Sequence, residues 1–155
     1  MSKTNAVRIL EAGRVTHSTH DYEVDENDLG GISVAEKIGA DPDAVFKTLV
    51  ATGDKNGINV FCIPVTQELN LKKAAAASKN KKIVMLKLKD LLPVTGYIHG
   101  GCSPIGMKKN FPVYIDETSQ LFKTIYVSAG VRGTQICLTP SDLQNITNAL
   151  FSDLI

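Results

Sequence analysis

The feature that most constrains the fold is the turn over residues 53–57, which lies between two runs of apolar and β-branched residues. It contains Asn56-Gly57, a dipeptide strongly favoured in tight hairpin turns because both residues tolerate a positive φ. The flanking runs, 46–51 and 58–64, have the composition of β-strands. The sequence therefore predicts a two-stranded antiparallel hairpin in the first half of the chain.

The remaining segments are short and alternate between helix and strand signals. We predict helices over residues 2–10, 33–39, 70–77, 87–92 and 139–150, and single helical turns at 41–42 and 117–122. We predict further strands over residues 15–22, 82–86, 111–115, 123–128 and 134–138. Because strands outnumber helices and hairpin turns recur, we expect an α+β fold with a mixed, mostly antiparallel sheet or open barrel flanked by helices.

Several predicted helix ends rest on particular residues. Ser2 or Thr4 is a candidate cap for the first helix, and Asn70 for the third. Ser33 and Glu36 have the spacing of a capping box. The fourth helix should stop before Pro93, and Leu150 should lie on the apolar face of the last helix.

Length and composition limit the class of protein. The 155 residues fit one domain, residues 1–155, with 43% hydrophobic residues. The sequence shows no signal peptide and no apolar run of membrane-spanning length, so we expect a cytoplasmic protein. Three scattered cysteines without a C-x-x-C pair argue against a zinc site or a disulfide framework. Lysines crowd the middle of the chain, which indicates either a solvated helix face or a phosphate-binding surface.

A glycine-rich stretch over residues 95–106 is the first candidate for a functional loop. Gly100-Gly101 can adopt unusual dihedral angles and allow a ligand to approach the backbone closely. A tight turn between two strands is the alternative interpretation. A second glycine loop, residues 129–133, contains Arg132, which either binds a carboxylate or phosphate or simply lies on a turn.

Lys47 is the strongest single candidate for a functional side chain. It stands in a predicted strand among apolar neighbours, so it either points to solvent on the alternate face or holds an anion at the rim of a pocket. Cys102 follows His99 by three residues, but no third group can be identified that would orient the histidine. We therefore do not assign Cys102 as a nucleophile, and we expect no conventional side-chain nucleophile.

Several separated motifs together resemble one family. The motifs are Phe46-Lys47-Thr48-Leu49, Pro64-Val65 with Leu69-Asn70-Leu71-Lys72-Lys73, Thr95-Gly96-Tyr97 with Gly100-Gly101-Cys102-Ser103-Pro104-Ile105-Gly106 and Lys108-Lys109, Ile115-Asp116, and residues 125–133. In order and spacing they resemble the YbaK/EbsC family over nearly the whole chain.

The resemblance implies a free-standing version of the editing domain that is inserted in bacterial prolyl-tRNA synthetases. The implied activity is trans-editing, in which an aminoacyl-tRNA deacylase cleaves a wrong amino acid from tRNA. In the YbaK branch the substrate is cysteine mischarged on proline tRNA, and the thiol of the substrate assists the cleavage. The expected partner is the acceptor end of the aminoacyl-tRNA, and the family suggests prolyl-tRNA synthetase as a second partner. No cofactor, metal or membrane is expected.

The resemblance also implies roles for individual residues. Lys47 would hold the phosphate or ribose of the terminal adenosine, and the backbone N–H groups of Gly100 and Gly101 would hold the ester carbonyl oxygen. Residues expected to bind the substrate are Tyr22, Leu29, Thr48, Ser103, Pro104, Ser128, Arg132 and Gln135. Arg132 would also bind the acceptor stem, together with Lys72, Lys73, Lys108 and Lys109.

Two departures from the family pattern leave the substrate open. Leu29 stands where the family often has an aromatic residue, and Gln135 stands where it has an acidic one. A deacylase for another small amino acid, such as alanine, is therefore an alternative. A non-catalytic module that binds tRNA or nucleotides and has a regulatory role is the alternative from another class.

Overall fold

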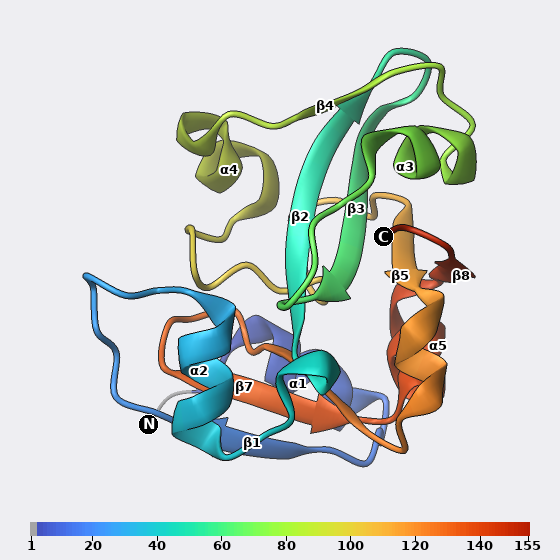
Figure 1. Ribbon diagram of the computed structural model, residues 1–155. Helices are drawn as coiled ribbons and strands as arrows, with labels where there is room; N and C mark the ends of the chain where they lie inside the picture. Colours follow the sequence, from blue (N-terminus) through green and yellow to red (C-terminus); the bar gives the residue numbers. More distant parts are fainter. Residues whose placement is uncertain (1–2) are drawn as a thin grey trace.

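The computed structural model describes residues 3–155, and the strands in these residues form two sheets (Figure 1). The smaller sheet has the order β1 (Ser18–Asp21), β7 (Thr134–Leu138), β6 (Ile125–Ser128). The larger sheet has the order β4 (Ile83–Met85), β2 (Phe46–Gly53), β3 (Gly57–Pro64), β5 (Val113–Asp116), β8 (Leu150–Ser152). The β3–β5 and β5–β8 pairs are parallel and the others are antiparallel, which confirms the predicted mixed, mostly antiparallel α+β fold.

The predicted hairpin is the long β2–β3 pair that stands at the centre of the molecule (Figure 1). Its register runs from Phe46 opposite Pro64 to Gly53 opposite Gly57. Side chains alternate between the two faces of a strand. Phe46 and Val50 therefore belong to the main core, which also contains side chains of α1 and of the smaller sheet, whereas Ala51 belongs to a second core beneath α3.

The helices are short and surround the sheets. They are α1 (Asn5–Ala12), α2 (Gly31–Ile38), α3 (Leu71–Ala77), α4 (Leu88–Thr95) and α5 (Pro140–Thr147), with 3-10 turns η1 (Pro42–Ala44) and η2 (Glu117–Leu121). Thr4 caps α1 by accepting the Val7 N–H at 3.2 Å, and Asn70 caps α3. The alternative cap Ser2, where the first helix was predicted to begin, lies outside the described residues.

The prediction that Ser33 and Glu36 form a capping box at the start of α2 is wrong. The N-cap is Gly30, which makes no side-chain cap, and Ser33 lies inside the helix. A Cβ on Gly31 would overlap the side chain of Val65. Close packing of the first helical turn against the segment after β3 therefore fixes this helix start, and a local cap does not.

The predicted C-terminal ends of two helices in the second half of the chain are also wrong. The helix α4 continues through Pro93 and ends where Gly96 adopts a left-handed conformation, with its N–H donating to Leu92 O. The last helix ends at Thr147, and Leu150 lies in β8 with an exposed side chain. The parallel partner β5 pairs with this segment as a strand, which overrides the helical spacing of its apolar residues.

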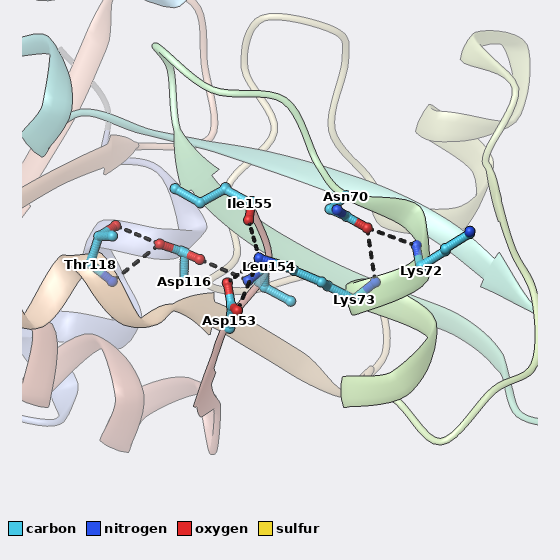
Figure 2. Close-up of polar contacts among 8 residues, drawn as sticks. All are labelled: Asn70, Lys72, Lys73, Asp116, Thr118, Asp153, Leu154 and Ile155. Atoms are coloured by element: carbon cyan, nitrogen blue, oxygen red, sulfur yellow. Dashed lines mark hydrogen bonds and ion pairs between the residues drawn. The ribbon is translucent and has the colours of Figure 1, made fainter.

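A buried carboxylate holds the segment after β8 in place (Figure 2). Asp116, at the end of β5, is fully buried and accepts the Leu154 N–H at 2.9 Å. The Asn70 N–H donates to Leu154 O at 2.8 Å, and Lys73 pairs with Asp153. These contacts attach β8 and the buried Leu154 to α3 and the second core.

The two sheets meet beside one end of β2. Val45 forms an isolated parallel bridge with Tyr126 of β6. On the edge away from β3, β4 pairs only with residues 51–53 of β2. Within residues 3–155, residues 46–49 of β2 therefore pair in no ladder on that edge, although β6 lies close to the start of β2.

Candidate functional site

A pocket of about 540 Å³ lies beside this open part of β2. Its walls come from β2, from the ends of β6 and β7, from the loop before α2, from α4 and from the first glycine loop. Six residues that were predicted for the site line it: Leu29, Lys47, Thr48, Gly100, Ser128 and Gln135. Residues from both sheets and two loops thus meet at one cavity.

Lys47 supplies positive charge to this pocket. It lies in β2 opposite Ile63, and it is half-buried. Within residues 3–155 the ion pairs are Lys3–Glu11 and Lys73–Asp153, so the Lys47 ammonium has no carboxylate partner. A half-buried cation without a protein anion is available to a phosphate or another anionic group of a ligand.

Ser128 and Gln135 form a polar pair on the part of the wall made by β6 and β7. The two residues face each other across the β6–β7 ladder, and both are buried. The Ser128 Oγ accepts the Gly130 N–H at 3.2 Å, which leaves its hydroxyl proton free to be donated. The Gln135 Oε1 is buried and receives no hydrogen bond from the described residues. This wall therefore offers both a donor and an acceptor to a small polar ligand.

The first glycine loop carries a backbone N–H group without an internal partner at Gly100. Gly100 has φ +83°, and its N–H has no hydrogen-bond acceptor within residues 3–155. The Gly101 N–H, in contrast, donates to Ile98 O at 3.0 Å. A Cβ on Gly101 would lie 3.0 Å from the Arg132 backbone nitrogen. Gly101 therefore permits close packing of the two glycine loops, and its N–H is already used within the first loop.

Five predicted residues lie outside the pocket wall: Tyr22, Gly101, Ser103, Pro104 and Arg132. The Arg132 Nε donates to His99 O at 2.9 Å, which links the two glycine loops at the rim. Ser103 is fully buried and its Oγ accepts the Ile105 N–H at 3.2 Å, so it stabilises a turn. The Tyr22 N–H donates to Gly133 O just after β1.

The pocket also contains residues that the sequence analysis did not predict as site residues. They are Asn27, Asp28, Gly30, Gly31, Val34, Val45, Phe46, Leu49, Val65, Leu91 and His99. Their nearness to Leu29 and Lys47 in the sequence accounts for most of them. His99 adjoins Gly100 in the sequence, whereas Val65 and Leu91 come from separate elements and only the tertiary fold brings them here.

The buried cysteines are protonated at neutral pH. Cys102 lines the pocket, and burial raises the pKa of its thiol to about 12. Burial likewise raises the pKa of Cys62 to about 12. Because the thiolate is the reactive form, neither thiol is activated as a nucleophile. Among residues 3–155, no three His, Cys, Asp or Glu side chains are grouped closely enough to bind a metal ion.

Comparison with known proteins places this chain in a family. Residues 32–146 match the family described as Aminoacyl-tRNA editing domain. The chain belongs to this aminoacyl-tRNA editing family. It is 50% identical over 152 residues to EbsC of Enterococcus faecalis, a proposed Cys-tRNA(Pro)/Cys-tRNA(Cys) deacylase, with 98% of this chain and 93% of EbsC covered. It is also 27% identical over 113 residues to YwhH of Bacillus subtilis, an uncharacterized protein, with 73% of this chain and 71% of YwhH covered.

Solved structures share the fold of this editing domain. A proposed trans-editing enzyme for prolyl-tRNA synthetase superposes with a TM-score of 0.83 at 24% identity, covering 99% of this chain and 98% of that one. The hypothetical protein APE2540 gives a TM-score of 0.88 at 19% identity, covering 97% and 99%. Among the described residues, no helix combines the length and the apolar composition needed to cross a membrane.

Proposed function

We propose that residues 1–155 form a single trans-editing deacylase domain that cleaves cysteine from Cys-tRNA(Pro). The observation that carries the proposal is the unpaired Lys47 ammonium, which shares a pocket with the free Gly100 N–H. The 50% identity to EbsC supports the choice of substrate. The proposed site of action is the cytoplasm, with prolyl-tRNA synthetase as a partner in selecting the tRNA.

The proposed mechanism needs positioning and charge stabilisation rather than a protein nucleophile. An aminoacyl ester is already reactive, so a fixed geometry and a donor for the developing negative charge suffice. Lys47 binds the phosphate or ribose of the terminal adenosine. The Gly100 N–H stabilises the ester carbonyl oxygen, while Gly101 keeps its own N–H on Ile98 O and holds the loop.

The thiol of the substrate takes the role of nucleophile. Its sulfur attacks the carbonyl carbon of the same aminoacyl group, and the ribose oxygen leaves with the thiol proton. The high pKa of the Cys102 thiol agrees with this division of roles, because the enzyme's own cysteine stays protonated. Ser128, Leu29 and Gln135 shape the wall that contacts the amino acid, and Thr48 lies beside Lys47.

Size alone gives limited selectivity in such a pocket. One methylene in a pocket is worth about 1–3 kcal/mol, so large side chains are excluded well and alanine, cysteine and serine are separated poorly. Reaction through the substrate thiol adds selectivity for cysteine, since alanine and serine have no thiol. The tRNA body and Arg132 at the rim supply the remaining recognition.

The decisive experiment is deacylation of tRNA(Pro) charged separately with cysteine, alanine, serine and proline. We expect rapid loss of cysteine and slow loss of the others. Lys47→Ala should lower the rate for cysteine by at least about a hundredfold, because the positioned cation is lost. Lys123→Ala is the matched control, because Lys123 is exposed and lies outside the pocket.

The alternatives predict different results in the same experiment. Preferential loss of alanine or serine would retain the site and refute the choice of cysteine. Full activity in a folded Lys47→Ala variant, judged by circular dichroism and melting temperature, would refute the proposed site. Binding of tRNA without acceleration of any ester would identify a non-catalytic module.

A further inference from the structure

We propose that the acceptor arm of the tRNA lies across a basic ridge formed by the tip of the β2–β3 hairpin, the segments on either side of β4 and the start of α4, an inference that rests on the proposed function. The ridge consists of the lysines Lys55, Lys79, Lys81, Lys82, Lys87 and Lys89. Lys72, Lys73, Lys108 and Lys109, which the sequence suggested for this role, are not part of it. The partner chemistry is an RNA phosphate backbone.

The ridge lysines are free to bind phosphate. All six side chains are exposed, and none belongs to either ion pair found within residues 3–155. Lys73 is different, because it pairs with Asp153. The Lys108 ammonium donates to Pro93 O. Lys73 and Lys108 are therefore engaged within the protein, whereas the six ridge lysines are free. Lys72 and Lys109 are also exposed and outside both ion pairs, but they belong to α3 and to the loop before β5 and not to the ridge segments.

A polar network fixes the loop that carries part of the ridge. The buried Asn80 side chain donates to Asn56 Oδ1 at 2.9 Å and accepts the Lys55 N–H at 3.0 Å. Asn56 in turn donates to Ser78 O at 2.8 Å. Lys79 between them has φ +61°, a conformation that is unfavourable for a residue with a side chain. The hairpin tip and the loop before β4 are thus held as one platform.

The ridge leads from the hairpin tip to the pocket. β4 pairs with β2 at residues 51–53, the Leu86 N–H donates to Val50 O at 3.0 Å, and Leu91 of α4 lines the pocket. Figure 1 shows β4 running across from the tip of the hairpin toward α4. Gly53 lies six residue steps after Lys47 along β2, which is about 20 Å at 3.3 Å per residue. The ester and the stem phosphates of one acceptor arm can therefore be contacted together.

The acidic charge of the loop before α2 also favours a path of the RNA from the pocket toward the ridge. The loop before α2 carries Glu23, Asp25, Glu26 and Asp28, all exposed, and Asp28 itself lines the pocket. Phosphates are repelled by this loop and attracted by the ridge. Asp54, an acid at the hairpin tip, directs its carboxylate to the backbone N–H groups of Lys81 and Lys82. The RNA should therefore leave the pocket over α4 and not over α2.

The test compares a ridge variant with a control of equal charge change. The ridge variant is Lys81→Gln/Lys82→Gln, which keeps both backbone contacts to Asp54. The control is Arg8→Gln/Lys123→Gln, because both side chains are exposed and lie outside the ridge. The measurements are anisotropy of uncharged tRNA(Pro) over a series of salt concentrations, and cleavage of Cys-tRNA(Pro) and of cysteine esterified to adenosine alone.

We expect the ridge variant to bind tRNA about tenfold more weakly at low salt. The slope of the logarithm of the binding constant against the logarithm of the salt concentration should be shallower by about 1.4–1.8, for two lost phosphate contacts. Its KM for Cys-tRNA(Pro) should rise with kcat unchanged, and its cleavage of the adenosine ester should equal that of the wild type. Unchanged tRNA affinity in the ridge variant, or an equal loss of affinity in the control, would refute the proposal that the ridge binds the acceptor arm. Failure of the wild type to cleave either ester would refute the proposed function, while the anisotropy would still decide the ridge.

Discussion

Gln135 illustrates how one residue can serve the site at a cost to stability. It is 6% exposed, it lines the pocket, and its Oε1 receives no hydrogen bond from residues 3–155. A buried acceptor without a donor costs about 1–3 kcal/mol. The ammonium group of an aminoacyl ester is a donor that could relieve this cost. The sequence marked Gln135 as an expected substrate-binding residue and as a departure from the family pattern, and the structure gives that departure a physical meaning.

Replacement of Gln135 with an apolar residue of similar shape should separate these two effects. We expect Gln135→Met to be as stable as the wild type or more stable by up to about 2 kcal/mol, because the unsatisfied oxygen is removed. We expect kcat/KM for Cys-tRNA(Pro) to fall by about tenfold, because a hydrogen bond to the substrate is lost. Urea unfolding and deacylation kinetics measure the two quantities. A less stable variant with full activity would show that Gln135 is a structural residue only.

At the scale of elements, α2 shows how tertiary contact positions a functional wall. This helix and the loop before it form one side of the pocket. Local signals suggested a start at Ser33, but the helix starts at Gly31, where a Cβ would overlap Val65. The absence of a side chain at Gly31 therefore sets the distance between α2 and the segment after β3.

Gly31→Ala should disturb both the fold and the pocket. Overpacking of a close contact costs about 1–3 kcal/mol, and α2 must shift to accommodate the methyl group. We expect lower stability by that amount and a reduced kcat/KM. Gly30→Ala is the control, because a Cβ there meets only Asp28 Oδ1 at 3.4 Å. Its stability and its kcat/KM should both change little. Equal melting temperatures for the two variants would contradict this account of the helix start.

At the scale of the whole molecule, the segment after β8 joins elements that are distant in the sequence. Asp116 of β5 accepts the Leu154 N–H, and Leu154 packs under α3 in the second core (Figure 2). This core covers the face of the β2–β3 hairpin that carries Ala51 and Phe61. The strand that carries Lys47 is therefore covered, on the face that also carries Ala51, by residues close to position 155.

Loss of the Asp116 carboxylate should destabilise the molecule without changing the site. We expect Asp116→Ala to lower the free energy of unfolding by about 2–4 kcal/mol, because hydrogen bonds to a charged buried acceptor are lost. At temperatures where the variant is folded, deacylation should be normal because Asp116 lies outside the pocket. Asp153→Asn breaks only an exposed ion pair and should cost less than about 1 kcal/mol, measured by urea unfolding. Similar losses in the two variants would show that burial of Asp116 contributes nothing.

The sequence by itself determined the features that depend on neighbouring residues. The Asn56-Gly57 pair located the turn of the β2–β3 hairpin, because turn preferences are local, although only Gly57 of the pair has a positive φ, at +77°. Thr4 and Asn70 were recognisable caps, since a cap bonds N–H groups two or three residues away. The class of fold followed from the number and spacing of such short segments, and Lys47 was placed correctly on a strand.

Only the tertiary structure decided the features that depend on distant partners. Leu150 has helical spacing in the sequence, but pairing with β5 made its segment a strand. Gly101 had the same local signal as Gly100, yet only the Gly100 N–H is free, because Ile98 O takes the other. The pocket itself brings two sheets, α4 and two loops together. Local preferences are worth a fraction of a kcal/mol per residue, so packing and long-range hydrogen bonds override them wherever the two conflict.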